Sequence, residues 1–119
     1  MPLSDQSKSY LSELIRLNKK DLIAIGYQKL TVDGTAGGVS LTVPTNASYA
    51  LIVLESSVTG QVAIRYLECG NTVYAVTATD GIGRSHLDAF DIDGKENMTN
   101  FRAIQTTAGT HTLHVQYYK

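Results

Sequence analysis

The sequence THTLHVQYY at residues 110–118 decides the fold class, because apolar and polar side chains alternate along it one by one. Alternation with a period of two is typical of a β-strand that buries one face and exposes the other. We therefore expect a strand whose Leu113, Val115 and Tyr117 face the core, with the residues between them on the opposite side.

Working outward from this stretch, short runs of the same character recur about every ten residues, separated by glycine, asparagine and aspartate. Residues 49–54 form an unbroken apolar run, which predicts a central strand covered on both faces. We expect glycine-rich connections at residues 33–38 and 79–85 and a turn at residues 93–97. The remaining strands are predicted at residues 23–32, 39–43, 61–67, 72–78, 86–92 and 100–105. The pattern predicts a mainly β fold, an antiparallel β-sandwich or jelly roll of about eight strands.

The N-terminal residues follow a different period. Leu11, Leu14 and Ile15 fall on one face of a helix, and we expect an amphipathic helix over residues 5–19. We divide the chain into an N-terminal helical arm, residues 1–22, and a β-sandwich domain, residues 23–119. The apolar stripe of the arm must cover something, either the chain's own sheet or a neighbouring subunit.

Composition and charge exclude several classes of function. Of 119 residues, 30 are Thr, Val or Ile, which favours strands. Ten basic against eleven acidic residues give a net charge of −1, without the basic concentration that nucleic-acid binding needs. No run is long and apolar enough for a membrane span or a signal peptide, so we expect neither nucleic acid nor membrane as a partner. The single Cys69 rules out an intrachain disulfide and a multi-cysteine metal cluster.

The residues capable of metal binding form no convincing set. His111 and His114 are three positions apart, so a strand sends them to opposite faces, and we expect solvent-facing or edge-strand histidines. Asp88, Asp91 and Asp93 resemble the start of a calcium loop, but a lysine stands where a third ligand is needed and flanking helices are missing. A polar turn explains these aspartates better than calcium does, and we expect no metal.

Catalytic motifs are also missing from the pattern. The glycine-rich stretches lack the lysine and hydroxyl residue of a phosphate loop, and no serine lies in a nucleophile elbow. We expect no enzymatic activity, no catalytic residue and no cofactor. A carbohydrate-binding module remains an alternative, although the chain has no Trp and its Tyr49, Tyr66 and Tyr74 are more simply core or face residues.

Several strand sequences carry a resemblance to a known family. They are YQKLTV (27–32), VSLTVP (39–44), ALIVLE (50–55), VAIRY (62–66), NFRAI (100–104) and LHVQYYK (113–119). In this order they resemble small structural proteins of tailed bacteriophages over residues 26–119. The helical arm is not part of that pattern, and residues 69–85 lack the acidic, glycine- and proline-containing turn that the resemblance would place there.

The resemblance implies a virion component without enzymatic activity, made in the host cytoplasm and built into the particle. We expect a capsid decoration or cement protein that binds across shell subunits, with the major capsid protein or neighbouring virion proteins as partners and further copies of itself in a homo-oligomer. A tail, collar or fibre-attachment adaptor is the alternative within the virion. The residues we expect at the partner interface are Leu11, Leu14, Ile15, Tyr117 and Tyr118.

Overall fold

A computed structural model describes residues 22–70 and 73–119 of the chain. These residues form two antiparallel sheets packed face to face, which confirms the mainly β, sandwich-like prediction. Residues 1–21 of the predicted arm, which include its predicted helix, lie outside the described residues.

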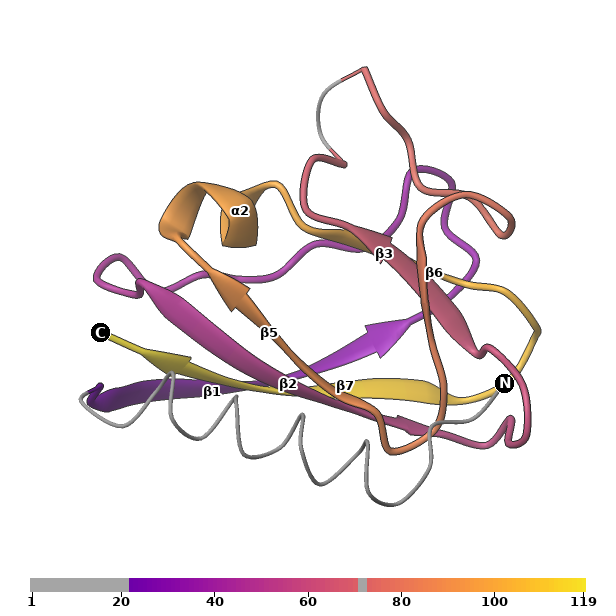
Figure 1. Cartoon of the computed structure of the whole chain (residues 1–119), viewed down its shortest axis with the longest axis horizontal. Coiled ribbons are helices and arrows are strands. Elements are labelled where there is room, and N and C mark those ends of the chain that lie inside the picture. Colours follow the sequence, from indigo (N-terminus) through magenta and orange to yellow (C-terminus); the bar gives the residue numbers. More distant parts are fainter. Residues whose placement is uncertain (1–21, 71–72) are drawn as a thin grey trace.

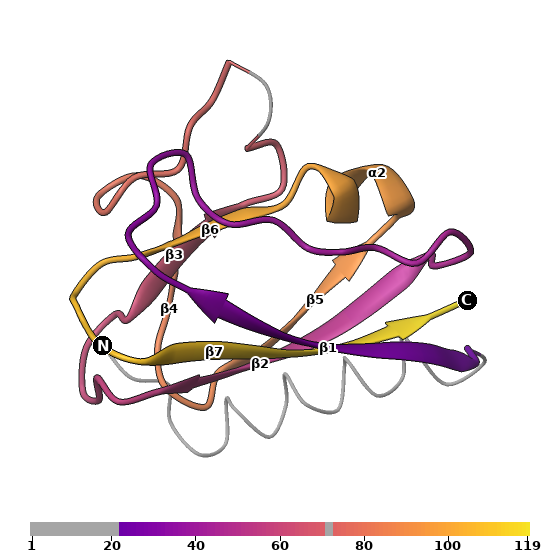
Figure 2. The same ribbon diagram turned by 180° about the vertical axis from the view of Figure 1, so that it is seen from behind.

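The larger sheet has four strands in the order β1-β7-β2-β5. Its strands are β1 (Ala24–Val32), β7 (His111–Tyr118), β2 (Tyr49–Ser56) and β5 (Ala89–Asp93). The smaller sheet has the order β4-β3-β6, from β4 (Ile82–Arg84), β3 (Ile64–Leu67) and β6 (Arg102–Gln105). The smaller sheet and the short helix α2 (Lys95–Thr99) lie on one side of the larger sheet (Figures 1 and 2).

The core lies between the sheets and follows the alternation of the strands. Ile52 and Leu54 of β2 and Leu113 of β7 are completely buried, as the sequence predicts for the inward positions. Each such side chain stabilises the fold by about 1.5–3 kcal/mol. From the smaller sheet, Tyr66 stacks on Phe90 of β5 with ring centroids 4.7 Å apart, and this aromatic contact joins the two layers.

Four of the predicted elements differ from the structure within the described residues. Residues 39–43 are not a strand, because this segment crosses between the sheets: Val39 makes one bridge to Ala103, and the Thr42 amide donates to the Gln28 side chain at 3.0 Å. Residues 73–78 are not a strand either. Within this irregular segment, the side chain of Val76 is buried.

The other two differences concern glycines. The predicted loop at residues 79–85 contains β4, which pairs with β3 although Gly83 lies at its centre. The predicted turn at residues 93–97 continues into α2, whose Met98 is completely buried and anchors the helix to the core. Seven strands are therefore present in the described part of the chain, against the eight or so expected.

Candidate functional site

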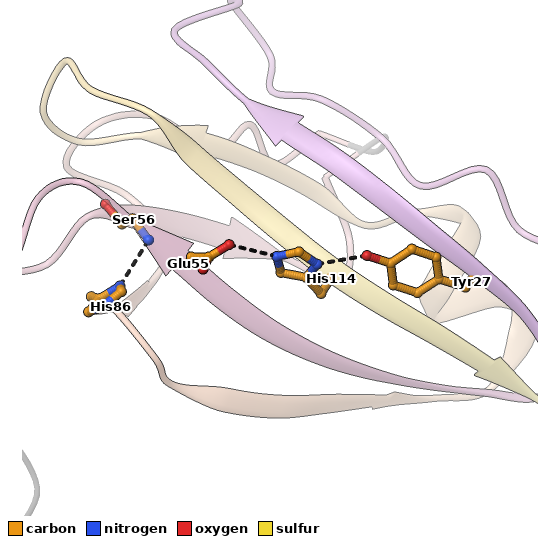
Figure 3. A network of polar contacts seen from close by, with 5 residues as sticks. All are labelled: Tyr27, Glu55, Ser56, His86 and His114. Atoms are coloured by element: carbon orange, nitrogen blue, oxygen red, sulfur yellow. Dashed lines mark hydrogen bonds and ion pairs between the residues drawn. The ribbon is translucent and has the colours of Figure 1, made fainter.

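A cluster of polar side chains surrounds the end of β2, where Glu55 and Ser56 are the last two residues of the strand (Figure 3). Alternation places Glu55 on the outer face of the larger sheet, the face turned away from the smaller sheet, and Ser56 on the inner face. All three histidines of the chain contact this pair of residues.

On the outer face, His114 bridges two neighbouring strands (Figure 3). Its Nε2 lies 3.0 Å from Glu55 Oε1, and its Nδ1 lies 2.7 Å from the hydroxyl of Tyr27. Because a carboxylate only accepts, His114 Nε2 carries a proton, and the Tyr27 hydroxyl contacts Nδ1 on the other side of the ring. The hydrogen bond and the charge of His114 lower the pKa of Glu55 below its usual value. The exposed carboxylate therefore stays ionised to lower pH than an isolated glutamate.

On the inner face, Ser56 and His111 form a buried pair. Ser56 Oγ lies 2.8 Å from His111 Nδ1, and His111 Nε2 lies 2.8 Å from the Thr107 carbonyl oxygen. Since a carbonyl only accepts, Nε2 is the protonated nitrogen, so Nδ1 accepts from the serine hydroxyl. Ser56 Oγ in turn accepts from the Val58 amide at 2.9 Å. The prediction of solvent-facing or edge-strand histidines is wrong for His111, which is completely buried on an internal strand.

A serine that donates to a histidine is the arrangement that activates a nucleophile. Here Ser56 is only 6% exposed and His111 is fully buried, and the serine oxygen already accepts a second hydrogen bond. The pair thus lacks access for a substrate and ties β2 and β7 to the chain segments that follow β2 and precede β7.

His86 completes the cluster by extending the sheet ladder. Pairing between β2 and β5 continues beyond the regular strand through Leu54, whose amide donates to Asp88 O at 3.0 Å and whose carbonyl accepts from the Leu87 amide at 2.7 Å. At the next position the His86 ring replaces a backbone partner, with its Nδ1 accepting from the Ser56 amide at 3.0 Å (Figure 3). The histidine therefore caps the end of the central strand.

The aspartates of the calcium-like pattern are dispersed by the fold. Asp88 accepts from the Ser85 amide at 2.7 Å in the turn before β5, and Asp91 accepts from the Tyr49 hydroxyl at 2.7 Å on the outer face. Within residues 22–70 and 73–119 no group of three His, Cys, Asp or Glu side chains is arranged to hold a metal ion. Burial, together with the charges of Asp91 and Asp93, raises the pKa of Glu68, which marks this end of β5 as electrically negative.

The predicted interface residues fall in three places. Leu11, Leu14 and Ile15 lie outside the described residues, so their role stays a prediction. Tyr117 is 1% exposed inside the sandwich, its hydroxyl donates to Gln28 Oε1 at 2.6 Å, and burial raises its pKa to about 12. Tyr118 lies on the outer face beside Tyr49 and is 5% exposed. Both tyrosines are thus buried within the single chain, and an interface role for them stays a prediction.

Large apolar side chains that are exposed lie elsewhere. They are Ile23 and Tyr27 near and on β1, Val62 before β3, Val73 and Tyr74 after β3, Ile82 on β4 and Leu87 before β5. Leu87 is also the one non-glycine residue of the described chain with a positive φ, 68°. The sequence alone did not predict that these apolar side chains are exposed, because apolar residues at exposed and at buried positions are indistinguishable in it.

Comparisons with known proteins add no relative. No protein-family model, no curated protein and no solved structure matches the chain. In the described part, no helix has both the length and the apolar character needed to cross a membrane.

Proposed function

We propose that this chain is a non-enzymatic structural protein of a bacteriophage virion, a decoration or cement protein that binds across the subunits of the capsid shell. The partners are the major capsid protein or neighbouring virion proteins, together with further copies of the chain. Within the virion, a β-sandwich suits such a role because it offers edges and faces to its neighbours.

One observation supports the proposal most directly: exposed apolar side chains lie at two opposite edges of the sandwich. β1 is an edge strand of the larger sheet, and Ile23 and Tyr27 are each 63% exposed there. β4 is an edge strand of the smaller sheet, and Ile82 and Leu87 at this side are 46% and 61% exposed. The two sides are opposite because β1 lies over β6, while the chain passes directly from β4 to β5.

Two separated apolar contacts fit a protein that bridges two neighbours in a lattice. Exposed apolar side chains on a small domain mark contact surfaces for other proteins. A protein that binds only the assembled shell stabilises the shell by mass action, because dissociation of the shell must also release the bound protein.

The proposal is tested by quantitative mass spectrometry of purified particles of the virus that encodes this chain. A ratio to the major shell protein near one, or near a simple fraction of one, supports a decoration role. A ratio of a few per cent would move the protein to the tail, collar or fibre attachment. Absence from the particle would refute the virion assignment.

The edge contacts are tested by occupancy of the particle. We expect Ile23→Asp and Leu87→Asp each to lower the number of bound copies at least tenfold, because each places a charge in an apolar contact. Thr59→Asp, exposed in the connection between β2 and β3, is the matched control and should leave occupancy unchanged. Wild-type occupancy by both edge variants would remove the main support for the bridging role.

A further inference from the structure

The hydrogen bonds of β7 determine which backbone groups of its neighbour β1 point outward. The carbonyl oxygens of Thr110 and Tyr118, at the two ends of β7, accept from Ser57 and Ser48 at 2.9 and 2.8 Å. The even-numbered residues of β7 therefore bond toward β2. In an antiparallel ladder the residues between them bond toward the strand on the other side, which is β1.

Three residues of β1 are left with backbone groups that point away from the sheet. The odd-numbered residues of β7 pair with the even-numbered ones of residues 26–32, so the N–H and C=O groups of Tyr27, Lys29 and Thr31 face the open side of this edge strand (Figure 2). No described residue bonds to these groups, and all three residues are exposed. A row of unpaired backbone groups on an edge strand is a template for pairing with a further strand.

The other edges of the two sheets are less suited to such pairing. Two copies joined through β5 would bring the carboxylates of Asp91 and Asp93 together, and like charges on paired strands repel. β4 has only three residues, with Gly83 at its centre, and the free side of β6 carries the bridge between Val39 and Ala103. β1, with nine residues, is the longest edge strand of the described chain.

We propose that β1 pairs antiparallel with β1 of a second copy of the chain, about a two-fold axis that passes through Gln28. Tyr27 of each copy then lies opposite Lys29 of the other. Because both residues direct their backbone groups to the shared edge, each of these two pairs exchanges two N–H···O=C hydrogen bonds. The pairing joins the larger sheets of the two copies into one continuous sheet.

The side chains and the ends of β1 favour this register over its neighbours. The ammonium group of Lys29 meets the ring of Tyr27 from the other copy, and this cation–π contact occurs twice. A shift that centres the axis on Lys29 would oppose two ammonium groups. A shift toward the C-terminal end would use Asp33, whose carbonyl oxygen already accepts from the Gln105 amide at 3.0 Å. A shift the other way meets the irregular pairing at residues 24–26.

The pairing names the occupant of the β1 contact, and so it rests on that part of the proposed function. A two-fold pair closes on itself, so it joins two copies and leaves the Ile82 and Leu87 side of each copy for another neighbour. An interface of a few residues on each side belongs to the weak class, so we expect the pair to form at high concentration and between copies that a lattice holds close together.

The first test is sedimentation equilibrium of the full chain between about 20 µM and about 1 mM, where a weak interface associates. We expect a monomer–dimer equilibrium. Lys29→Pro should raise its dissociation constant at least tenfold, because proline removes an outward N–H that β7 does not use. Lys29→Ala keeps this N–H and should raise the constant at most about threefold, through the lost cation–π contact. A wild-type chain that stays monomeric or grows beyond the dimer, or a Lys29→Pro variant that dimerises as the wild type does, would overturn the proposal.

The second test uses the wild-type protein and so does not depend on a variant that folds. Nuclear magnetic resonance reads amide exchange at the same two concentrations. The higher concentration should slow exchange of the Tyr27 and Lys29 amides at least twofold, while the amide of Thr31, outward but beyond the paired stretch, keeps its rate. Unchanged rates at Tyr27 and Lys29 would overturn the proposal.

Failure of this pairing and failure of the virion assignment are distinguishable. Both tests use the isolated protein, so a chain without a dimer can still be counted in purified particles. Absence of the chain from the particle would leave the dimer in solution measurable.

Discussion

Replacement of Ser56 by alanine should destabilise the protein by about 2–4 kcal/mol, because one small side chain satisfies two other groups. Removal of Oγ deprives the fully buried His111 Nδ1 of its donor and the Val58 amide of its acceptor. A buried polar group that loses its partner costs about 1–3 kcal/mol, and the half-buried Val58 amide should fall at the lower end. Against a typical total of about 5–15 kcal/mol, this is a large fraction of the stability of one domain.

The assay is urea unfolding at pH 7 followed by far-ultraviolet circular dichroism, with the free energy taken from the midpoint and slope. Ser40→Ala deletes the same oxygen at an exposed position and should change the free energy of unfolding by less than about 0.5 kcal/mol. In the double variant Ser56→Ala/His111→Leu the buried imidazole is no longer left without a donor, although the Val58 amide and the Thr107 carbonyl still lose their partners. The cost of the double variant should therefore fall about 1–2 kcal/mol below the sum of the two single variants. A cost for Ser56→Ala as small as that of Ser40→Ala, or additive single costs, would refute the reasoning.

Three further predictions concern single positions, each measured by the same unfolding assay. Gly38→Ala should cost more than about 2 kcal/mol, because φ is +84° and a Cβ would lie 2.8 Å from Val76 Cγ1; a neutral result would contradict this. Leu87→Asn should stabilise the protein by about 0.5–1 kcal/mol, because asparagine tolerates the φ of 68° better, and a loss of stability would show that Leu87 is not strained. The contact with His114 lowers the pKa of Glu55 in the folded protein. The ionised carboxylate therefore stabilises the fold at pH values above the ordinary glutamate pKa, and this stabilisation is lost as the pH falls through the lowered pKa of the folded state. The stability difference between wild type and Glu55→Gln should therefore shrink from pH 6 to about pH 3, and a constant difference would exclude this linkage.

Strands with clean alternation could be predicted from the sequence, and those that depend on tertiary context could not. The pattern in residues 110–118 identifies β7 and its inward side chains, since each inward residue is apolar. Residues 39–43 alternate equally well, but this segment crosses from the smaller sheet to β1, so its backbone has no strand to pair with along its length. In the opposite direction, β4 forms around Gly83 because β3 offers an edge, and the local sequence does not reveal that edge.

The polar cluster was only partly predictable. The three-residue spacing of His111 and His114 correctly places them on opposite faces. The same alternation puts His111 on the inward side with Leu113, so the sequence did indicate a buried histidine. A buried histidine needs a polar partner, and in the structure this partner is Ser56. The contact of His86 with β2 could not be predicted, because it depends on the turn at Leu87 that returns the chain to the larger sheet.

The order of strands in the larger sheet has a consequence for the timing of folding during synthesis. Of the strands described, β7 is translated after the six others, yet it lies between β1 and β2 and pairs with both of them. Until β7 has left the ribosome, β1 and β2 have no common partner, and the apolar face of the nascent sheet stays open. Pairings between segments so distant in sequence form slowly, and the exposed strands are prone to aggregation in the meantime. The pairing of β7 with both neighbours is therefore the step that closes the larger sheet.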